Sequence, residues 1–279
     1  MERELTLATL TLAVCGPALL VSGSLIPDSW STGSGRSLER SLGRRLWWPA
    51  VPPLLLFALL LGWASQEPDS ADEGIGPIVA VLAPVFAAVW CRALVRAIVS
   101  LVPGRRQRCA ARTVGLLRPR VVIGPELMLR LDSAELQAVL AHERAHARHR
   151  DPLRILLAQL VTDLQWPLAR PRARHASWRE ALEISRDEEA RAAGVDGPDL
   201  AAAILEAASS LVVRHGATAA LVDEGRLARR IARLLTPMAP LEELPPGRWL
   251  LALLAVSMVA AVGLGHVFGE PAVMVVAGL

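Results

Sequence analysis

Four apolar runs, each near the length needed to cross a bilayer, constrain the fold of this sequence more than any other feature. A transmembrane helix needs about 20 mostly apolar residues. The only charged side chains inside the runs are Arg92 and Arg96, near the end of the third, where long side chains can reach the membrane interface. We therefore expect four transmembrane helices, rather than buried helices of a soluble core, at residues 5–26, 46–65, 74–102 and 249–268.

The first run could instead belong to a cleaved signal peptide. Such a peptide begins with a positively charged segment. Residues 1–4, Met-Glu-Arg-Glu, carry two acidic side chains and one basic one. We therefore expect an uncleaved membrane helix at residues 5–26.

The charges between the runs predict how the chain is oriented. Four arginines lie between the first two runs, at positions 36, 40, 44 and 45, whereas residues 66–73 carry four acidic side chains and no basic one. Loops rich in Lys and Arg stay in the cytoplasm. We therefore expect an external N-terminus, three membrane helices in residues 1–102, a cytoplasmic domain in residues 103–247, and a fourth membrane helix with a short extracytoplasmic tail in residues 248–279.

The domain between the third and fourth runs is expected to be mainly helical with a small strand component. Asp132 and Glu135 form a capping-box pattern that opens a helix to about Arg150, and Asp151 with Pro152 can begin the next one. Strands are expected at 120–123 and 127–131, further helices at 177–193, 199–216 and 224–235, and an irregular basic loop at 167–175. Together with the four runs, this predicts a mainly α, four-helix membrane protein with a small α+β cytoplasmic domain inserted between helices three and four.

The strongest chemical signal is His142-Glu143-Arg144-Ala145-His146 on the first of these helices. Residues four apart share a helix face, so both imidazoles can bind one zinc ion. Glu143 lies about 100° around the helix, where its carboxylate can reach a water at the metal and act as general base. With six histidines in the chain, the pattern has roughly a 1% chance of arising at random.

A catalytic zinc needs a third protein ligand. His149 is available by spacing, but the helix expected at 177–193 is the better source. Glu183 and Asp187 share a face there, so Glu183 could bind the metal while Asp187 accepts a hydrogen bond from a ligand imidazole. Spacing alone does not choose Glu183 over Glu180.

The chain resembles the BlaR/MecR-type membrane metallopeptidases. The resemblance rests on three segments: Arg120 to Gly124, Leu131 through the His-Glu-x-x-His motif to Asp151, and Trp166 to Asp187. It implies a gluzincin-type fold, with His142, His146 and Glu183 as zinc ligands, Glu143 as general base and Asp187 as an orienting residue. It also implies a cytoplasmic transcriptional repressor as substrate. Because only a short apolar tail follows Phe268, we do not expect the penicillin-binding sensor domain that the best-known members carry.

These observations predict an integral-membrane zinc endopeptidase that hydrolyses a cytoplasmic winged-helix repressor. The expected partners are this repressor and membrane lipid. The net charge of +3 is small and the arginines are not interleaved with aromatic residues, so no direct contact with nucleic acid is expected. The oligomeric state stays open, a homodimer included. A housekeeping membrane protease and a non-enzymatic membrane transducer are the alternatives.

Three details remain open in the sequence. The oxyanion stabiliser has four candidates, His175, Arg179, Arg214 and His215. The basic amphipathic helix expected at 224–235 could lie on an anionic membrane surface or pack on the domain. The strand at 120–123 could offer an edge along which an extended substrate adds.

Overall fold

Helices form nearly all of the regular structure in the computed structural model, which describes residues 2–26, 35–65, 77–101, 111–215, 224–236 and 254–266. A two-stranded antiparallel sheet is added by β1 and β2. In chain order the elements are α1 (Glu2–Leu25), α2 (Gly35–Trp47), η1 (Trp48–Ala50), α3 (Val51–Ala64), α4 (Pro77–Leu101), β1 (Ala111–Val114), β2 (Arg120–Ile123), α5 (Pro125–Met128), α6 (Ser133–Arg148), α7 (Asp151–Asp163), α8 (Arg170–Ala192), α9 (Gly197–His215), α11 (Glu224–Leu235) and a last helix at Leu254–His266.

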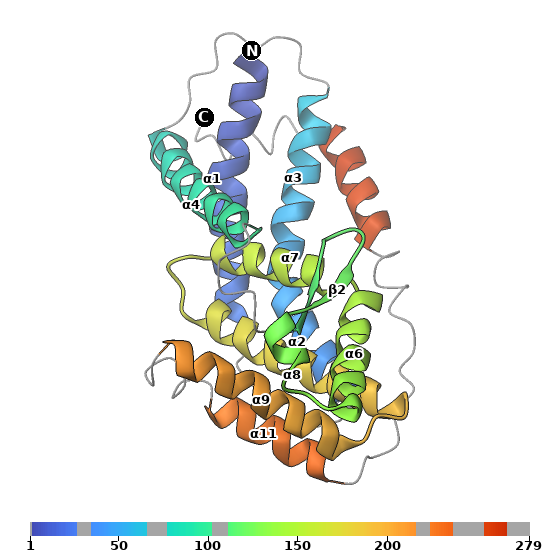
Figure 1. Cartoon of the computed structure of the whole chain (residues 1–279). Helices are drawn as coiled ribbons and strands as arrows, with labels where there is room; N and C mark the ends of the chain where they lie inside the picture. Colours follow the sequence, from blue (N-terminus) through green and yellow to red (C-terminus); the bar gives the residue numbers. More distant parts are fainter. Residues whose placement is uncertain are drawn as a thin grey trace.

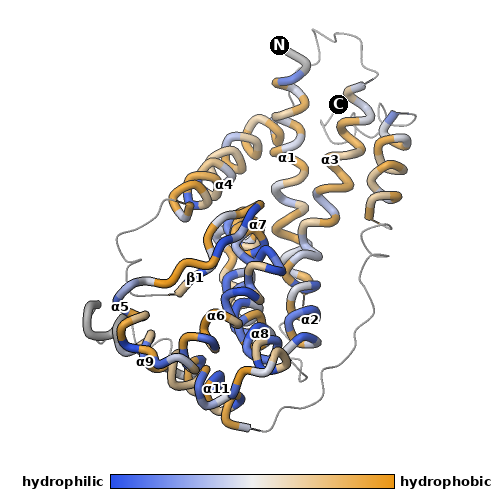
Figure 2. The backbone as a smooth tube through the Cα atoms, turned by 45° about the vertical axis from the view of Figure 1, so that its right-hand side comes forward, coloured by the Kyte–Doolittle hydropathy of each residue, from blue (hydrophilic) through white to orange (hydrophobic). Residues whose placement is uncertain are grey.

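The elements form two layers (Figure 1), which we call the apolar layer and the polar layer. The apolar layer holds α1, α3, α4 and the last helix, and the polar layer holds α6, α8, α9 and α11 (Figure 2). Three helical stretches are long and apolar enough to cross a membrane, Glu4–Leu25, Gly35–Ala64 and Pro77–Leu101. The predicted mainly α fold with a small sheet and these three candidate spans is confirmed.

The fourth predicted run contains a shorter apolar helix, Leu254–His266, whose flanks lie outside the described residues. This helix packs closely on α3 through two glycines. A Cβ on Gly62 would collide with the carbonyl oxygen of Val262, and one on Gly265 would collide with that of Leu59. Small residues that let two backbones approach are typical of helix contacts within membranes.

The arginine-rich segment before α3 is a helix, where the sequence was interpreted as a loop between two membrane spans. Leu38, Leu42 and Leu46 of α2 are buried together with Trp178 and Leu182 of α8. Its apolar residues recur every four positions, so they form one face, and burying that face against α8 stabilises the helix. Helix α2 therefore belongs to the polar layer, although it forms the start of the second candidate span, Gly35–Ala64.

Helix α8 begins at Arg170, so the predicted irregular loop at 167–175 is wrong beyond its first residues. The arginines of this segment bind the last turn of α1. Arg174 donates to the carbonyl oxygen of Gly23 at 2.9 Å, and Arg170 donates to that of Ser24 at 3.2 Å. Because the last carbonyls of a helix have no partner within it, these guanidinium groups satisfy them and fix α8 beneath α1.

The predicted strand at 120–123 is confirmed, whereas residues 127–131 form the end of α5 and a turn instead of a second strand. The partner of β2 is β1, in the arginine-rich stretch before it. Gly115 leads into the connection between the two strands with φ +93°, and a Cβ there would lie 2.7 Å from the carbonyl oxygen of Arg118. Only glycine adopts that conformation without strain.

The predicted capping box is confirmed: Asp132 accepts from the backbone N–H groups of Ala134 and Glu135, and Glu135 accepts from that of Asp132. The helix that it opens, α6, ends at Arg148. Arg150 then takes a left-handed conformation with φ 51°, which turns the chain sharply into α7. Asp151 is the first residue of α7, not its N-cap as predicted, and its side chain points back toward α6.

Helix α11 packs on α8 and α9, which decides between the two interpretations of this basic amphipathic segment. Ile231 and Leu234 join a buried cluster with Leu200 of α9. On its polar face, Arg229 donates to Glu180 at 2.6 Å. Its apolar face is covered by protein, so this face is not free to lie on a membrane.

Candidate metal centre

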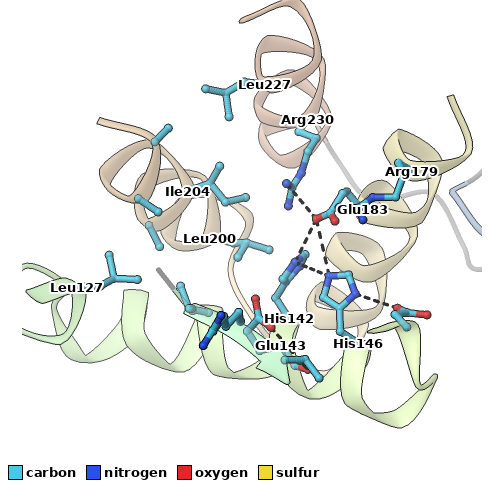
Figure 3. A pocket seen from close by; sticks show the side chains of 18 of the residues that line it. Leu127, His142, Glu143, His146, Arg179, Glu183, Leu200, Ile204, Leu227 and Arg230 are labelled. Carbon is cyan, nitrogen blue, oxygen red and sulfur yellow. Dashed lines mark hydrogen bonds and ion pairs between the residues drawn. The ribbon is translucent and has the colours of Figure 1, made fainter. Parts of the chain in front are cut away.

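Three side chains from α6 and α8 bring potential metal-binding atoms together (Figure 3). His142 and His146 lie on one face of α6, with their Nε2 atoms 3.1 Å apart. Glu183 of α8 points at both, its Oε2 lying 3.5 Å from Nε2 of His142 and 3.7 Å from Nε2 of His146. The donors that the sequence singled out therefore form one cluster, and they could hold a metal ion.

Glu143 lies beside this cluster and is held by the sheet. Its side chain is 9% exposed and lines the same cavity as the three donors. Thr113 of β1 has its hydroxyl oxygen 2.8 Å from both Oε2 and the backbone oxygen of Glu143, and its single proton can be donated to either. Strand β1 thus orients the carboxylate predicted to act as general base.

Two further carboxylates contact the imidazoles on the side away from the cluster. Asp151 Oδ2 lies 2.8 Å from Nδ1 of His146, and Asp187 Oδ1 lies 2.9 Å from Nδ1 of His142. The second contact has a poor angle for a hydrogen bond. Carboxylates in this position fix the ring and its tautomer, leaving Nε2 for a metal. Asp187 thus lies where the sequence predicts an orienting residue.

The electrostatics of the cluster favour an ionised carboxylate next to imidazoles that hold protons. Burial opposes the charge on Glu183, but hydrogen bonds with His142 and His146 hold its pKa well below the ordinary value. Burial likewise disfavours a charged His146, yet its bonds to Asp151 and Glu183 raise its pKa to about 9. At neutral pH a metal ion would therefore displace a proton from His146 as it binds.

Arg230 of α11 completes the wall of the site. Its Nε and one terminal nitrogen each lie 2.8 Å from an oxygen of Asp187. Its other terminal nitrogen lies 3.2 Å from Glu183 Oε2 (Figure 3). Burial of Asp187 is outweighed by this positive charge, which lowers the pKa of the carboxylate. Arg230 thus keeps two acidic residues of α8 ionised in a largely buried position.

A cavity of about 480 Å³ opens in front of Glu143 and the three donors. Its wall opposite α8 is apolar, contributed by α5, α6 and α9, and includes Leu127, Val139, Leu200 and Ile204. Three consecutive residues of β1, Ala111 to Thr113, line another side. The cavity therefore combines polar groups that converge at one end with an apolar wall, which is typical of an enzyme cleft.

The remaining candidates from the sequence lie elsewhere or have other partners. His149 is exposed and its Nε2 lies 2.8 Å from Glu189. Glu180 pairs with Arg226 and Arg229 of α11 instead of facing the donors. Of the oxyanion candidates, Arg179 lines the cavity and His175 does not, while the side chains of Arg214 and His215 lie outside the described residues.

Sequence reasoning missed three residues of the site. Thr113 lies in β1, a strand that was not predicted because the sequence around it is rich in arginine. Asp151 was interpreted as a helix cap, although its position five residues after His146 was visible. Arg230 lies in α11, 84 residues beyond His146, and no local pattern connects the two residues. Each depends on a contact between elements that are separate in the sequence.

Two imidazoles four residues apart on a helix, a glutamate between them and a carboxylate from a second helix are the side chains that HExxH metallopeptidases use. Together with the candidate membrane spans, they define the class as a membrane metallopeptidase. Residues 112–233 match the family model described as BlaR1 peptidase M56, which confirms the resemblance seen in the sequence. No curated protein and no solved structure matched the chain.

Proposed function

We propose that the protein is an integral-membrane zinc endopeptidase that cuts a cytoplasmic protein, a transcriptional repressor, in regulatory signalling. The observation that carries the proposal is the convergence of His142, His146 and Glu183 on one point with Glu143 beside it. The family match supports peptidase activity. We propose the identity of the metal, the substrate, and the position of the site on the cytoplasmic side of the membrane.

The donor set fits zinc. Around a tetrahedral zinc with bonds of about 2.0–2.1 Å, ligand atoms lie about 3.3 Å from one another. The three donor atoms are separated by 3.1, 3.5 and 3.7 Å. Two imidazoles and one carboxylate leave a fourth position for water or substrate, as in catalytic zinc sites.

The chain's own residues account for the proton transfers of peptide hydrolysis. When bound, zinc supplies Lewis-acid polarisation of the scissile carbonyl and lowers the pKa of water at the site. Glu143 takes the proton of the attacking water on its carboxylate and passes it to the leaving amine. Thr113 holds that carboxylate in position through its hydroxyl group.

Strand β1 offers the edge for an extended substrate, in place of the β2 edge considered from the sequence. It lines the cavity, and it pairs with β2 along one side only among the described strands. A substrate strand added to the other side would form main-chain hydrogen bonds beside Glu143. The apolar wall favours apolar substrate side chains next to the bond that is cut.

The cytoplasmic orientation is supported by α2. Its arginines mark the cytoplasmic side under the positive-inside rule. Because α2 packs on α8, we place the metal centre on the same side of the membrane as these arginines. A cytoplasmic repressor could therefore reach the site without crossing the bilayer.

The variant Glu143→Gln tests the proposal. It keeps the three donors but removes the group that accepts the proton, so we expect wild-type zinc content and a loss of about 10²–10⁴-fold in cleavage rate. The substrate for the assay is any winged-helix repressor that is encoded beside the gene. In cells, the repressor should stay intact in the variant strain under inducing conditions. Continued cleavage there would show that another protease is responsible.

A further inference from the structure

Helix α2 contributes a buried carboxylate to the polar layer. Glu39 is 7% exposed, although α2 forms the first part of the second candidate membrane span. Its Oε1 accepts from a terminal nitrogen of Arg154 at 2.6 Å and from one of Arg186 at 3.3 Å. The two arginines come from α7 and α8, so Glu39 joins three helices.

The same two arginines hold Asp151, which contacts a proposed metal ligand. Arg154 donates to Asp151 Oδ1 at 2.7 Å, and Arg186 donates to both oxygens of that carboxylate. Asp151 Oδ2 in turn lies 2.8 Å from Nδ1 of His146. An uninterrupted series of charged groups therefore runs from Glu39 in α2 to His146 in α6.

Glu39 supplies one of the negative charges that face the two arginines of this network. Arg154 and Arg186 both contact Glu39 and Asp151, and Arg186 also lies 3.7 Å from Glu189. Arg186 and Asp151 are almost completely buried. Without the charge of Glu39, Arg154 would keep Asp151 as its carboxylate partner among the described residues, and Arg186 would keep Asp151 and the more distant Glu189. In a buried site a change in the charges around Asp151 is poorly screened by water. It would shift the Asp151 carboxylate and weaken its hydrogen bond with His146.

We propose that Glu39 is a positioning residue of the metal centre, acting on His146 through Arg154, Arg186 and Asp151. The inference rests on the metal site proposed above. Under this proposal, α2 helps to position a metal ligand of the peptidase. Because α2 continues through η1 into α3, a displacement of the second membrane helix would move Glu39 and, through this network, a metal ligand.

The test compares zinc affinity in the full-length protein, purified in detergent, by competition with a chelator. We expect Glu39→Gln to weaken zinc binding about tenfold, the lower end of the effect seen when residues that orient metal ligands are changed. The control is Arg44→Gln, which removes one charge at an exposed position of the same helix and should leave the affinity unchanged. The absorption spectrum of bound cobalt should shift in Glu39→Gln alone, because it reports ligand geometry.

A double-mutant cycle separates this role from general support of the fold. Asp151→Asn interrupts the network, so adding Glu39→Gln to it should change zinc affinity by less than about twofold. If Glu39→Gln cannot be purified in folded form, Glu39→Asp is measured instead. It draws the carboxylate back by one methylene and should weaken binding about threefold.

Three results would overturn the proposal: wild-type affinity in Glu39→Gln, wild-type affinity in Glu39→Asp when only that variant folds, or an undiminished Glu39→Gln effect in the Asp151→Asn background. Failure of the wild-type protein to bind zinc would instead overturn the metal site on which the inference rests.

Discussion

The spacing of His142 and His146 brings their imidazoles to one face of α6, but Glu183 from another helix completes the donor set. We expect His146→Ala to retain less than about a tenth of the wild-type zinc, because two donors hold the metal poorly. Metal analysis of the purified protein measures this. His149→Ala is the matched control, since it removes an exposed histidine one turn further along and should keep full occupancy. Full occupancy in His146→Ala would refute the assignment.

Thr113 contributes to the site without touching the donors. Thr113→Val keeps the shape of the side chain but removes the hydroxyl group that holds Glu143. A hydrogen bond to a charged group contributes about 1.5–3 kcal/mol, so we expect at least about a tenfold loss in turnover with unchanged zinc content. Thr113→Ser restores the hydroxyl group and should recover most of the rate. Equal rates in Thr113→Val and wild type would show that Glu143 needs no such support.

At the scale of elements, α2 and α8 act as one packed unit. Leu46 of α2 is 1% exposed and packs in the cluster around Trp178. Leu46→Ala should cost about 2–5 kcal/mol through lost burial and the remaining cavity, and it should lower the thermal unfolding midpoint. Leu54→Ala on α3 is the comparison, because that side chain is 41% exposed in the apolar layer and should matter little. Similar midpoints for both variants would argue against α2 as part of the peptidase core.

The contacts between layers also explain the two arginines of the third apolar run. Arg96 of α4 pairs with Asp163 at the end of α7 at 3.0 Å. The guanidinium carbon of Arg92 lies 5.2 Å from the ring centre of Trp166. Both side chains therefore connect the apolar layer to the polar layer, where the sequence suggested only that they reach the membrane interface.

At the scale of the whole molecule, the metal centre should lie on the cytoplasmic side of a four-span protein. Reporter fusions measure this directly. A fusion after Gly216, between α9 and α11, should give a cytoplasmic signal. A fusion within residues 66–76, in the acidic segment, should give an extracytoplasmic one. The reverse pattern would overturn the orientation and, with it, a cytoplasmic substrate.

Short-range patterns in the sequence determined much of this protein. Apolar run length predicted the candidate spans, the Asp132 and Glu135 pattern predicted the start of α6, and a four-residue spacing brought His142 and His146 to one face. These features depend on neighbours within one or two turns, and for that reason a single sequence contains them.

The tertiary structure decided which distant groups meet. Spacing left Glu180 and Glu183 equivalent, but packing turned Glu180 to the arginines of α11 and Glu183 to the imidazoles. Asp151 became a partner of His146, and Glu39 joined the network around it. These choices follow from burial. A charged group removed from water needs a partner of opposite charge, and only the packing of helices far apart in the chain determines which partner is within reach.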